Sequence, residues 1–349
     1  MFVVIYFNFN NIRHYKKQYQ MKINYSFLKI KKEDFPKNLT IEPTNTCNLN
    51  CPLCPTGLNS LNRDKRDMTL DEYKSIIEQA KGKVDNIILY LFGEPFLHKD
   101  VLDMTKYSFE AGMNVSISTN GTLIQGKAHA EQIINSGVST ISISLDGVQK
   151  NTYNLYRIGG DFEKVLNNIK YLVEARNKTK NKNVKIIIQT VVMKQNEHQR
   201  DTLRKISKEL GADAYYEKNL IIPANIETEP DKFKEMADKY LPNDKKMQLY
   251  ELKDGYYVMS GSIHNNCGFL FNQKMMTICS NGNVIPCCHD NKSEYIMGNV
   301  FEETLSQIWN NKKFKKYKKA IKKDQSSIAL CRTCPNAREK TAKSCYYEL

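Results

Sequence analysis

Three short apolar runs decide the fold: Val115–Ser118 (VSIS), Thr140–Leu145 (TISISL) and Val184–Val192 (VKIIIQTVV). Helix-like sequence separates such runs, as in Val101–Gly112 and Phe162–Lys178. Short apolar runs that alternate with helices are typical of buried parallel strands joined by right-handed crossovers. The central part of the chain is therefore predicted to be an α/β domain.

Three further strand-like runs extend this pattern outward, at Leu39–Glu42, Asn86–Phe92 and Ala214–Ile222. Six strands are too few for a closed eight-stranded barrel. We predict a partial (β/α)6 barrel over residues 39–222 and prefer it to a doubly wound sheet. In both architectures the chemistry belongs at the carboxyl ends of the strands.

The rest of the chain divides into three segments. Residues 1–38 form an N-terminal extension, with Met21 as a second plausible start, and we assign them no function. Residues 223–262 are polar and interrupted by prolines, and they predict a linker with one or two helices. Residues 263–349 are rich in cysteine and form a segment too small to be held by its core alone, so we expect a metal centre there.

Composition limits the partners that we expect. The chain of 349 residues has 52 Lys and Arg against 38 Asp and Glu, a net charge of +14. The lysines are scattered, and no arginine-rich or aromatic pattern typical of nucleic-acid binding accompanies them. The densest run, Lys312–Lys319, predicts a solvated helix with Phe314, Tyr317 and Ile321 facing inward. No apolar run has the length of a membrane span, and we predict a soluble, cytoplasmic protein that binds neither membrane nor nucleic acid.

Ten cysteines lie in two groups far apart in the sequence. A small secreted disulfide scaffold would distribute its cysteines throughout, and no signal peptide is apparent, so metal or cluster binding is the better explanation. The cysteines are at positions 47, 51 and 54, and then at 267, 279, 287, 288, 331, 334 and 345.

The first group is the loop Cys47-Asn48-Leu49-Asn50-Cys51-Pro52-Leu53-Cys54, directly after the first predicted strand. A structural zinc site uses four ligands, whereas three thiolates suit a [4Fe–4S] cluster with one iron open to a ligand. By itself the spacing leaves two alternatives, chance clustering and zinc binding with a distant fourth ligand.

This loop, at this place in a βα-repeat domain, resembles that of the radical S-adenosylmethionine (SAM) superfamily, and the resemblance covers residues 39–222. Leu53 departs from the aromatic residue of many members. The resemblance implies that Cys47, Cys51 and Cys54 hold a [4Fe–4S] cluster whose open iron binds SAM.

Motifs at later strand ends extend the resemblance. Leu91–Pro95 is similar to the family's Gly-Gly-Glu-Pro segment, which binds the methionine ammonium group; an ordinary turn is the alternative. Polar residues after the next strands suit the ribose hydroxyls and the carboxylate of SAM. The structural alternative for Arg157 is an ion pair with Asp161, which itself is expected to cap a helix. The implied SAM-binding residues are Gly93, Glu94, Pro95, Ser118, Thr119, Asn120, Ser144, Asp146, Arg157 and Gln189.

The second cysteine group resembles the SPASM or twitch domain of radical SAM enzymes, given Pro286-Cys287-Cys288 and the Cys-x-x-Cys pair at its end. Four thiolates would suit zinc equally well. The resemblance assigns one auxiliary [4Fe–4S] cluster to Cys267, Cys287, Cys331 and Cys334. Cys279, Cys288 and Cys345 are left as buried thiols, with Cys345 as the replacement ligand.

The resemblance implies an oxidoreductase that cleaves SAM reductively and abstracts hydrogen from a small molecule or a peptide, with ferredoxin or flavodoxin as electron donor. His289 and Asp290 are candidates for a general base, or for hydrogen-bonding partners beside the cluster. Sulfatase maturases have an Asp at the position of Cys288, and this difference argues against sulfatase maturation as the function. The alternatives are a maturase of ribosomal peptides or proteins and a non-catalytic iron–sulfur or zinc protein.

Overall fold

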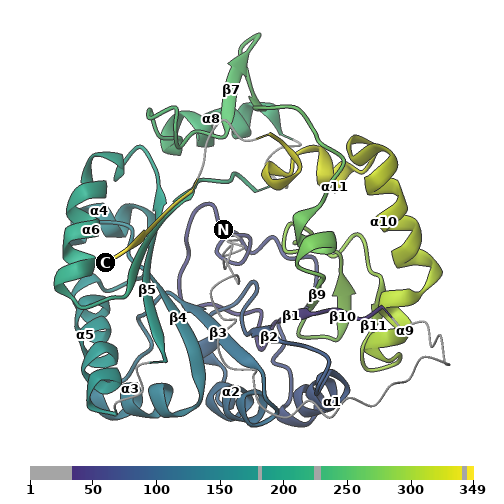
Figure 1. Ribbon diagram of the computed structural model, residues 1–349. Coiled ribbons are helices and arrows are strands. Elements are labelled where there is room, and N and C mark those ends of the chain that lie inside the picture. Colours follow the sequence, from purple (N-terminus) through teal and green to yellow (C-terminus); the bar gives the residue numbers. More distant parts are fainter. Residues whose placement is uncertain (1–33, 180–182, 224–228, 340–343) are drawn as a thin grey trace.

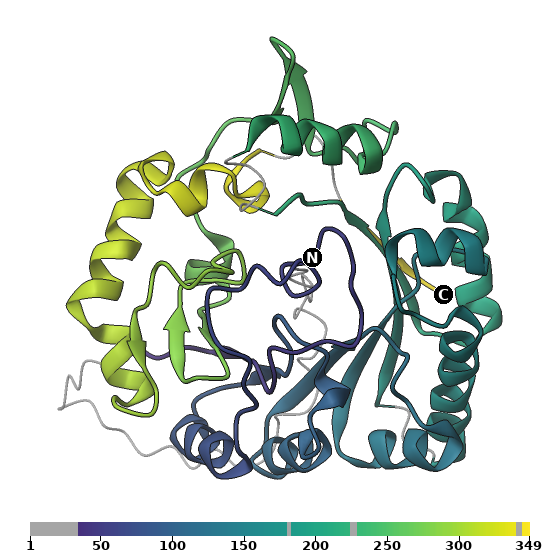
Figure 2. The same cartoon turned by 180° about the vertical axis from the view of Figure 1, so that it is seen from behind.

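The structure is a computed structural model that describes residues 34–179, 183–223, 229–339 and 344–349. Its elements are arranged in an open ring around a curved sheet. The helices lie on the outside of the sheet, and the first cysteine loop lies on the inside (Figure 1; Figure 2). Six parallel strands follow one another in sequence order: β1 (Asn38–Ile41), β2 (Asn86–Ile88), β3 (Asn114–Thr119), β4 (Val138–Ser144), β5 (Lys185–Val192) and β6 (Ala214–Asn219).

Each crossover therefore moves the chain in the same direction around the sheet. A doubly wound sheet reverses its strand order at a switch point, and this order does not reverse among β1 to β6. The α/β prediction is confirmed, and the strand order is that of the predicted partial barrel. Strand β2 is shorter than predicted: it ends at Ile88, so residues 89–92 form a loop.

The helices cover the outside of these strands (Figure 1). The predicted capping box is present, with Thr69 Oγ1 accepting from Glu72 N at 3.2 Å and Glu72 Oε2 accepting from Thr69 N at 2.8 Å. Asp161 caps α5 as predicted. The helices are α1 (Leu70–Ala80), α2 (Val101–Glu110), α3 (Gly126–Asn135), α4 (Lys150–Tyr156), α5 (Phe162–Lys178) and α6 (Arg200–Glu209).

The C-terminal region extends the same sheet at both edges. Strand β9 (Met275–Ile278) pairs in parallel with β1, and β10 (Asn283–Ile285) and β11 (Gly298–Asn299) follow it. At the opposite edge, β12 (Cys345–Glu348) is antiparallel to β6. We expected residues 263–349 to need a metal centre because their own core is too small. The structure shows a second source of stability, since this region packs into the same hydrophobic core as the parallel strands.

That shared core explains the helices of the C-terminal region. Trp309, Phe314 and Ile321 belong to the same buried cluster as Leu39 and Ile41 of β1. The helices are α9 (Leu305–Asn310), α10 (Lys312–Asp324) and the short α11 (Ala329–Arg332). The prediction for α10 is confirmed, since Phe314, Tyr317 and Ile321 are its buried residues.

The predicted linker contains one described helix, α8 (Pro230–Tyr240), and a hairpin that we did not predict. The hairpin strands are β7 (Tyr250–Lys253) and β8 (Tyr256–Met259). Asp254 and Gly255 join them with φ angles of 50° and 83°. Asp-Gly is a strong hairpin signal because both turn residues need positive φ, so the sequence did contain the information. In the described part of the chain no helix is both long enough and apolar enough to span a membrane.

Candidate functional site

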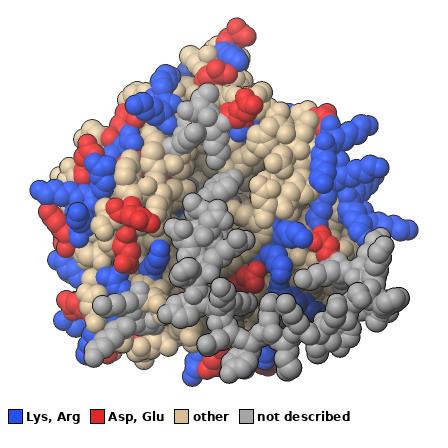
Figure 3. Space-filling view, viewed as in Figure 1, with Lys and Arg blue, Asp and Glu red and all other residues tan. Residues whose placement is uncertain are grey.

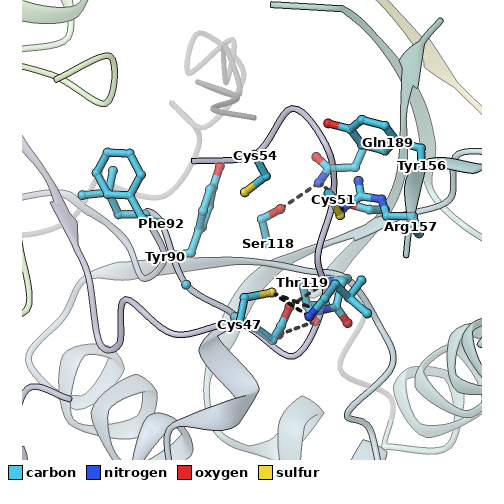
Figure 4. Close-up of a pocket in the computed structure, with 16 residues that line it drawn as sticks. Cys47, Cys51, Cys54, Tyr90, Phe92, Ser118, Thr119, Tyr156, Arg157 and Gln189 are labelled. Carbon is cyan, nitrogen blue, oxygen red and sulfur yellow. Dashed lines mark hydrogen bonds between the residues drawn. The ribbon is translucent and has the colours of Figure 1, made fainter. Parts of the chain in front are cut away.

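A pocket at the carboxyl ends of the parallel strands brings the first cysteine group together with most of the predicted SAM-binding residues (Figure 4). The three cysteines come from the loop after β1. The opposite wall comes from the ends of β3, β4 and β5 and from the segment after α4. The predicted residues that line the pocket are Cys47, Cys51, Cys54, Gly93, Glu94, Ser118, Thr119, Asn120, Ser144, Arg157 and Gln189.

Close backbone packing holds the cysteine loop against the loop after β2. A Cβ atom on Gly93 would lie 2.2 Å from the carbonyl oxygen of Thr44, so no larger residue fits there. Glu94 N donates to the carbonyl oxygen of Thr46 at 2.8 Å. Gly57 lets the cysteine loop fold closely on itself, because a Cβ atom there would lie 2.5 Å from Cys51 O. Gly93 thus lets the two loops meet at the pocket, and Gly57 keeps the cysteine loop compact.

Glu94 is buried, and its carboxylate is held in a fixed position. It accepts hydrogen bonds from Thr119 Oγ1 at 2.7 Å, from Asn120 N at 2.8 Å and from Phe96 N at 3.2 Å. Burial raises the pKa of Glu94, and these donors oppose that rise. Pro95 does not line the pocket; it begins a short 3-10 turn over Pro95–Leu97.

Two polar side chains point at the cysteine sulfurs. Asn120 Nδ2 lies 3.9 Å from Cys47 Sγ, and Arg157 Nη1 lies 3.8 Å from Cys51 Sγ. Burial raises the pKa of Cys47 to about 12 and also raises the pKa of Cys51. Such thiols stay protonated at neutral pH unless a cation takes up the thiolate charge. Donors aimed at these sulfurs fit a site that holds an iron–sulfur cluster.

Asp146 is the second predicted residue, after Pro95, that does not line the pocket, because it lies behind Arg157. Its Oδ2 is 2.5 Å from Arg157 Nε, and its Oδ1 accepts from Val191 N at 2.7 Å. The structural alternative that paired Arg157 with Asp161 was also wrong. Asp146 instead orients the guanidinium that faces Cys51.

Gln189 links the strand ends across the floor of the pocket. Its Nε2 donates to Ser118 Oγ at 2.7 Å and to Ser144 Oγ at 3.0 Å. Its Oε1 accepts from Lys218 Nζ, a buried amine on β6. We did not predict Lys218, although a lysine inside the apolar run Ala214–Ile222 was a visible signal. Burial lowers the pKa of Lys218 well below its ordinary value.

The four predicted auxiliary cysteines also meet. Cys287 follows β10, and its pKa is raised well above the usual range. Burial is the largest cause, and the thiols nearby add to it: Cys288, Cys334, Cys267 and Cys331. Cys331 lies in the main core, with its Sγ 3.5 Å from the hydroxyl of Tyr317. Burial raises the pKa of Cys267 and Cys331 to about 11. Four clustered thiols fit a fully ligated iron–sulfur cluster.

The spare cysteines differ from our expectation in one respect. Cys279 and Cys288 are buried as predicted. Cys345 is not a replacement ligand, because it lies on β12 opposite Glu217 of β6, at the far edge of the sheet from β10. Cys288 is the spare cysteine next to Cys287, and its thiol is one of the causes that raise the pKa of Cys287.

The candidate general base is not at the pocket. Asp290 is buried and closes its own loop, accepting from Glu294 N at 2.8 Å and from Tyr295 N at 2.9 Å. His289 also lies outside the pocket lining. The carboxylate of Asp290 therefore stabilises a turn that follows Cys287 and Cys288.

Among the described residues, no three His, Cys, Asp or Glu side chains converge so as to hold a single metal ion. A zinc site needs its ligands around one point. In a four-iron cluster each cysteine binds a different iron, so the sulfurs need not converge on one centre.

Comparison with known families decides between these possibilities. The model of the Radical SAM superfamily matches residues 41–206, and the model of the SPASM iron–sulfur cluster-binding domain matches residues 267–335. The chain is a radical SAM enzyme with a C-terminal SPASM domain. It therefore uses a SAM-binding [4Fe–4S] cluster, SAM itself and auxiliary iron–sulfur chemistry.

Curated relatives align with between half and four fifths of this radical SAM chain. An AdoMet-dependent heme synthase of Methanosarcina barkeri is 28% identical in an alignment of 306 positions that covers 79% of this chain and 82% of the relative. The tungsten-containing aldehyde ferredoxin oxidoreductase cofactor-modifying protein of Pyrococcus furiosus is 27% identical over 80% of this chain and 82% of its own. The PqqA peptide cyclase of Bradyrhizobium diazoefficiens is 24% identical over 51% of this chain and 45% of its own.

Solved structures share the fold of the radical SAM and SPASM regions. Native anSMEcpe with bound AdoMet matches with a TM-score of 0.59 and 20% identity, over 87% of this chain and 92% of that one. SuiB of Streptococcus suis bound to S-adenosylmethionine matches with a TM-score of 0.56 and 19% identity, over 86% and 72%. At these identities the likeness supports the fold alone.

Proposed function

We propose that this radical SAM enzyme cleaves SAM reductively and abstracts a hydrogen atom from a small-molecule or peptide substrate, in a net oxidation that the auxiliary cluster assists. The observation that carries this proposal is the single pocket in which Cys47, Cys51 and Cys54 face polar side chains from the ends of β3, β4 and β5. An electron carrier has no need of the polar strand ends.

We assign the SAM-binding cluster to Cys47, Cys51 and Cys54, and the auxiliary cluster to Cys267, Cys287, Cys331 and Cys334. When bound, the first cluster and SAM supply the 5′-deoxyadenosyl radical, which is the difficult part of the chemistry. The protein supplies binding, orientation and exclusion of water.

Two side chains are suited to the amino-acid part of SAM, and a third positions one of them. Glu94 is fixed by Thr119 and by the backbone of Asn120, so it presents a preoriented carboxylate to an ammonium group. The guanidinium of Arg157 is suited to a carboxylate, and Asp146 sets its orientation from behind. We therefore assign binding roles to Glu94 and Arg157 and a positioning role to Asp146.

The polar floor suits the ribose hydroxyls. Ser118 and Ser144 line the pocket, and Gln189 holds both hydroxyl groups through its amide nitrogen. Serine hydroxyls both donate and accept, so they match a ribose diol. Lys218 fixes the amide orientation of Gln189 from the side of β6.

The side of the pocket toward the C-terminal region is apolar. Tyr90, Leu91 and Phe92 follow β2 and line the pocket, and Leu91 and Phe92 pack in one buried cluster with Cys279 and Cys288. We place the reacting part of the substrate on this side, between the two cysteine groups. An apolar wall excludes water from the reacting carbon.

A peptide or protein maturase is the second candidate. It is supported by the similarity to the PqqA peptide cyclase and by the shared fold with SuiB, one of whose structures has the precursor peptide SuiA bound. The proposed site serves both kinds of substrate, because the radical chemistry is the same. The proposed electron donor is a ferredoxin or a flavodoxin.

The test measures the products of cleavage. Protein reconstituted anaerobically with iron and sulfide, a low-potential chemical reductant and SAM should release 5′-deoxyadenosine and methionine even without a substrate. With a substrate deuterated at the reacting carbon, the label should move into the 5′ position. Reduced, iron-replete protein that forms no 5′-deoxyadenosine would contradict the proposal in favour of an electron carrier.

A variant tests the assigned role of Glu94. Glu94→Ala should weaken SAM binding by about 2 kcal/mol, or roughly thirtyfold, because a charge-assisted hydrogen bond is lost. The matched control is Glu110→Ala at the exposed end of α2, which should bind SAM as the wild type does. Equal SAM affinities of the wild type and both variants would show that Glu94 does not bind SAM.

A further inference from the structure

Helix α10 carries an unusual concentration of positive charge. Its sequence from Lys312 to Asp324 contains eight lysines and one aspartate, so this one helix accounts for +7 of the net charge of +14. Figure 3 shows Lys and Arg side chains gathered along the edge that α10 occupies in Figure 1. Lys312, Lys316, Lys319 and Lys323 follow one another at helical spacing and are all exposed.

Folding does not explain this charge. Lysines at i and i+4 repel one another, as Lys312 and Lys316 do and Lys319 and Lys323 do, and such pairs destabilise a helix. Lys312 and Lys313 also stand in the first turn, where the helix dipole disfavours cations and where α10 has no acidic residue. Among the described residues, no lysine of α10 forms a salt bridge.

The opposite face of the same helix reaches the auxiliary cysteines. Tyr317 is buried on that face, with its hydroxyl 3.5 Å from Cys331 Sγ. The exposed lysines are thus separated from a proposed cluster ligand by about one helix diameter, ~10 Å. Lys318 lies between the two faces, with Nζ 3.3 Å from the centre of the Trp309 ring, and has a packing role.

We propose that the outer lysine face of α10 is the docking surface for an acidic one-electron donor protein of the flavodoxin or ferredoxin type. The proposal rests on the function proposed above, because only a redox enzyme needs such a donor. In each transfer the donor is oxidised by one electron and the auxiliary centre is reduced by one; the auxiliary centre then returns to its oxidised state by passing that electron to the SAM-binding cluster. Neither transfer makes or breaks a bond. Complementary charge raises the rate at which the two proteins meet.

Nucleic acid fits this surface less well. The outward face has lysines but no arginine and no aromatic side chain, whereas nucleic-acid sites use arginine for phosphates and bases and aromatic rings for stacking. Proximity to Cys331 also has no purpose in nucleic-acid binding. An RNA ligand is therefore an outcome of the test that would count against the proposal.

The experiment measures association of the full chain with a purified acidic flavodoxin at low ionic strength. The test variant is Lys316→Gln/Lys319→Gln/Lys323→Gln. The control is Lys164→Gln/Lys170→Gln/Lys185→Gln, which removes the same charge from exposed positions on and near α5, across the molecule from α10. We expect about tenfold slower association for the test variant, near wild-type association for the control, and a weaker salt dependence in the test variant alone.

Several outcomes would overturn the proposal. Unchanged association of the test variant would do so, and an equal loss in both variants would show a net-charge effect without a specific surface. The proposal also fails if the test variant keeps flavodoxin binding but loses binding to a single-stranded RNA 20-mer. Thermal unfolding should show the test variant at least as stable as the wild type, because repulsive lysine pairs are removed.

Cleavage assays separate this proposal from the function on which it rests. With a chemical reductant the test variant should release 5′-deoxyadenosine at the wild-type rate, and with flavodoxin as reductant it should be several-fold slower. If the wild type releases none with the chemical reductant, the proposed function fails, and the binding measurement still decides the docking surface. Equal flavodoxin-driven rates in the test variant and the wild type would contradict docking on α10.

Discussion

The two cysteine groups are built in different ways. Cys47, Cys51 and Cys54 lie on one loop, face a pocket and receive contacts from Asn120 and Arg157. The four auxiliary cysteines come from three segments between residues 267 and 334, and three of them, Cys267, Cys287 and Cys331, lie in or against the main hydrophobic core. The first site is surrounded by hydrogen-bonding groups and open space, and the second by packed apolar side chains.

This difference indicates a division of labour. A site that must admit SAM needs room and polar groups at fixed positions, which the strand ends provide. A centre that transfers electrons needs only to be held in place, and apolar packing does this. Burial raises the pKa of Cys47 and Cys51 in the first group and of Cys267 and Cys331 in the second, so these four thiols become thiolates when iron takes up the charge.

Removing the first group should have the largest effect. Cys47→Ala/Cys51→Ala/Cys54→Ala should lower the iron content from about eight to about four per chain and abolish 5′-deoxyadenosine formation. The control, Cys345→Ala on β12, should keep both. Measurable cleavage by the triple variant would show that the pocket cysteines do not hold the SAM-binding cluster.

Removing part of the second group should have a different effect. Cys331→Ala/Cys334→Ala should also lose about four irons, lower the stability of the C-terminal region and stop substrate turnover, yet leave uncoupled SAM cleavage with a chemical reductant. Iron analysis and product chromatography measure both properties. If this variant is folded and loses SAM cleavage as completely as the triple variant of the first group, the proposed division of labour is contradicted.

The polar surroundings of the first group predict a large stability effect at Asp146. Asp146→Asn should lower the free energy of unfolding by about 3 kcal/mol, because it leaves the buried Arg157 without its anionic partner. Asp161→Asn is the matched control, since Asn caps a helix as well as Asp does. Urea denaturation under anaerobic conditions compares the two variants, and similar losses would show that the pair with Arg157 contributes little.

Lys218 predicts a pH dependence of stability that arises in the polar floor of the pocket. Burial lowers the pKa of Lys218 in the folded chain below the ordinary 10.5. Between those two pKa values the unfolded chain binds more protons, so stability rises with pH, by up to about 1.4 kcal/mol per unit for this one group. Lys218→Met should reduce that slope. Urea denaturation from pH 7 to 10 measures it, and parallel curves for wild type and variant would show an amine that stays charged in the fold.

Much of the fold and of the first site could be predicted from the sequence. The alternation of strands and helices repeats locally, and the carboxyl ends of parallel strands meet at one edge, so Gly93, Ser118 and Gln189 were predictable pocket residues. The Asp254-Gly255 hairpin was predictable too, and we missed it because Pro and polar residues around it suggested a linker.

The sequence by itself determined the barrel strands, the cysteine loop and the lysine helix, because each depends on spacing within one segment. Only the tertiary structure decided that Asp146 faces Arg157 and not the pocket, that Asp290 closes its own loop, and that Cys345 lies on the edge of the sheet opposite to β10. The same holds for the shared core of the two regions and for the contact between Tyr317 and Cys331. These features join segments far apart in the chain, and the direction of a buried side chain depends on its packing partners, which local sequence does not specify.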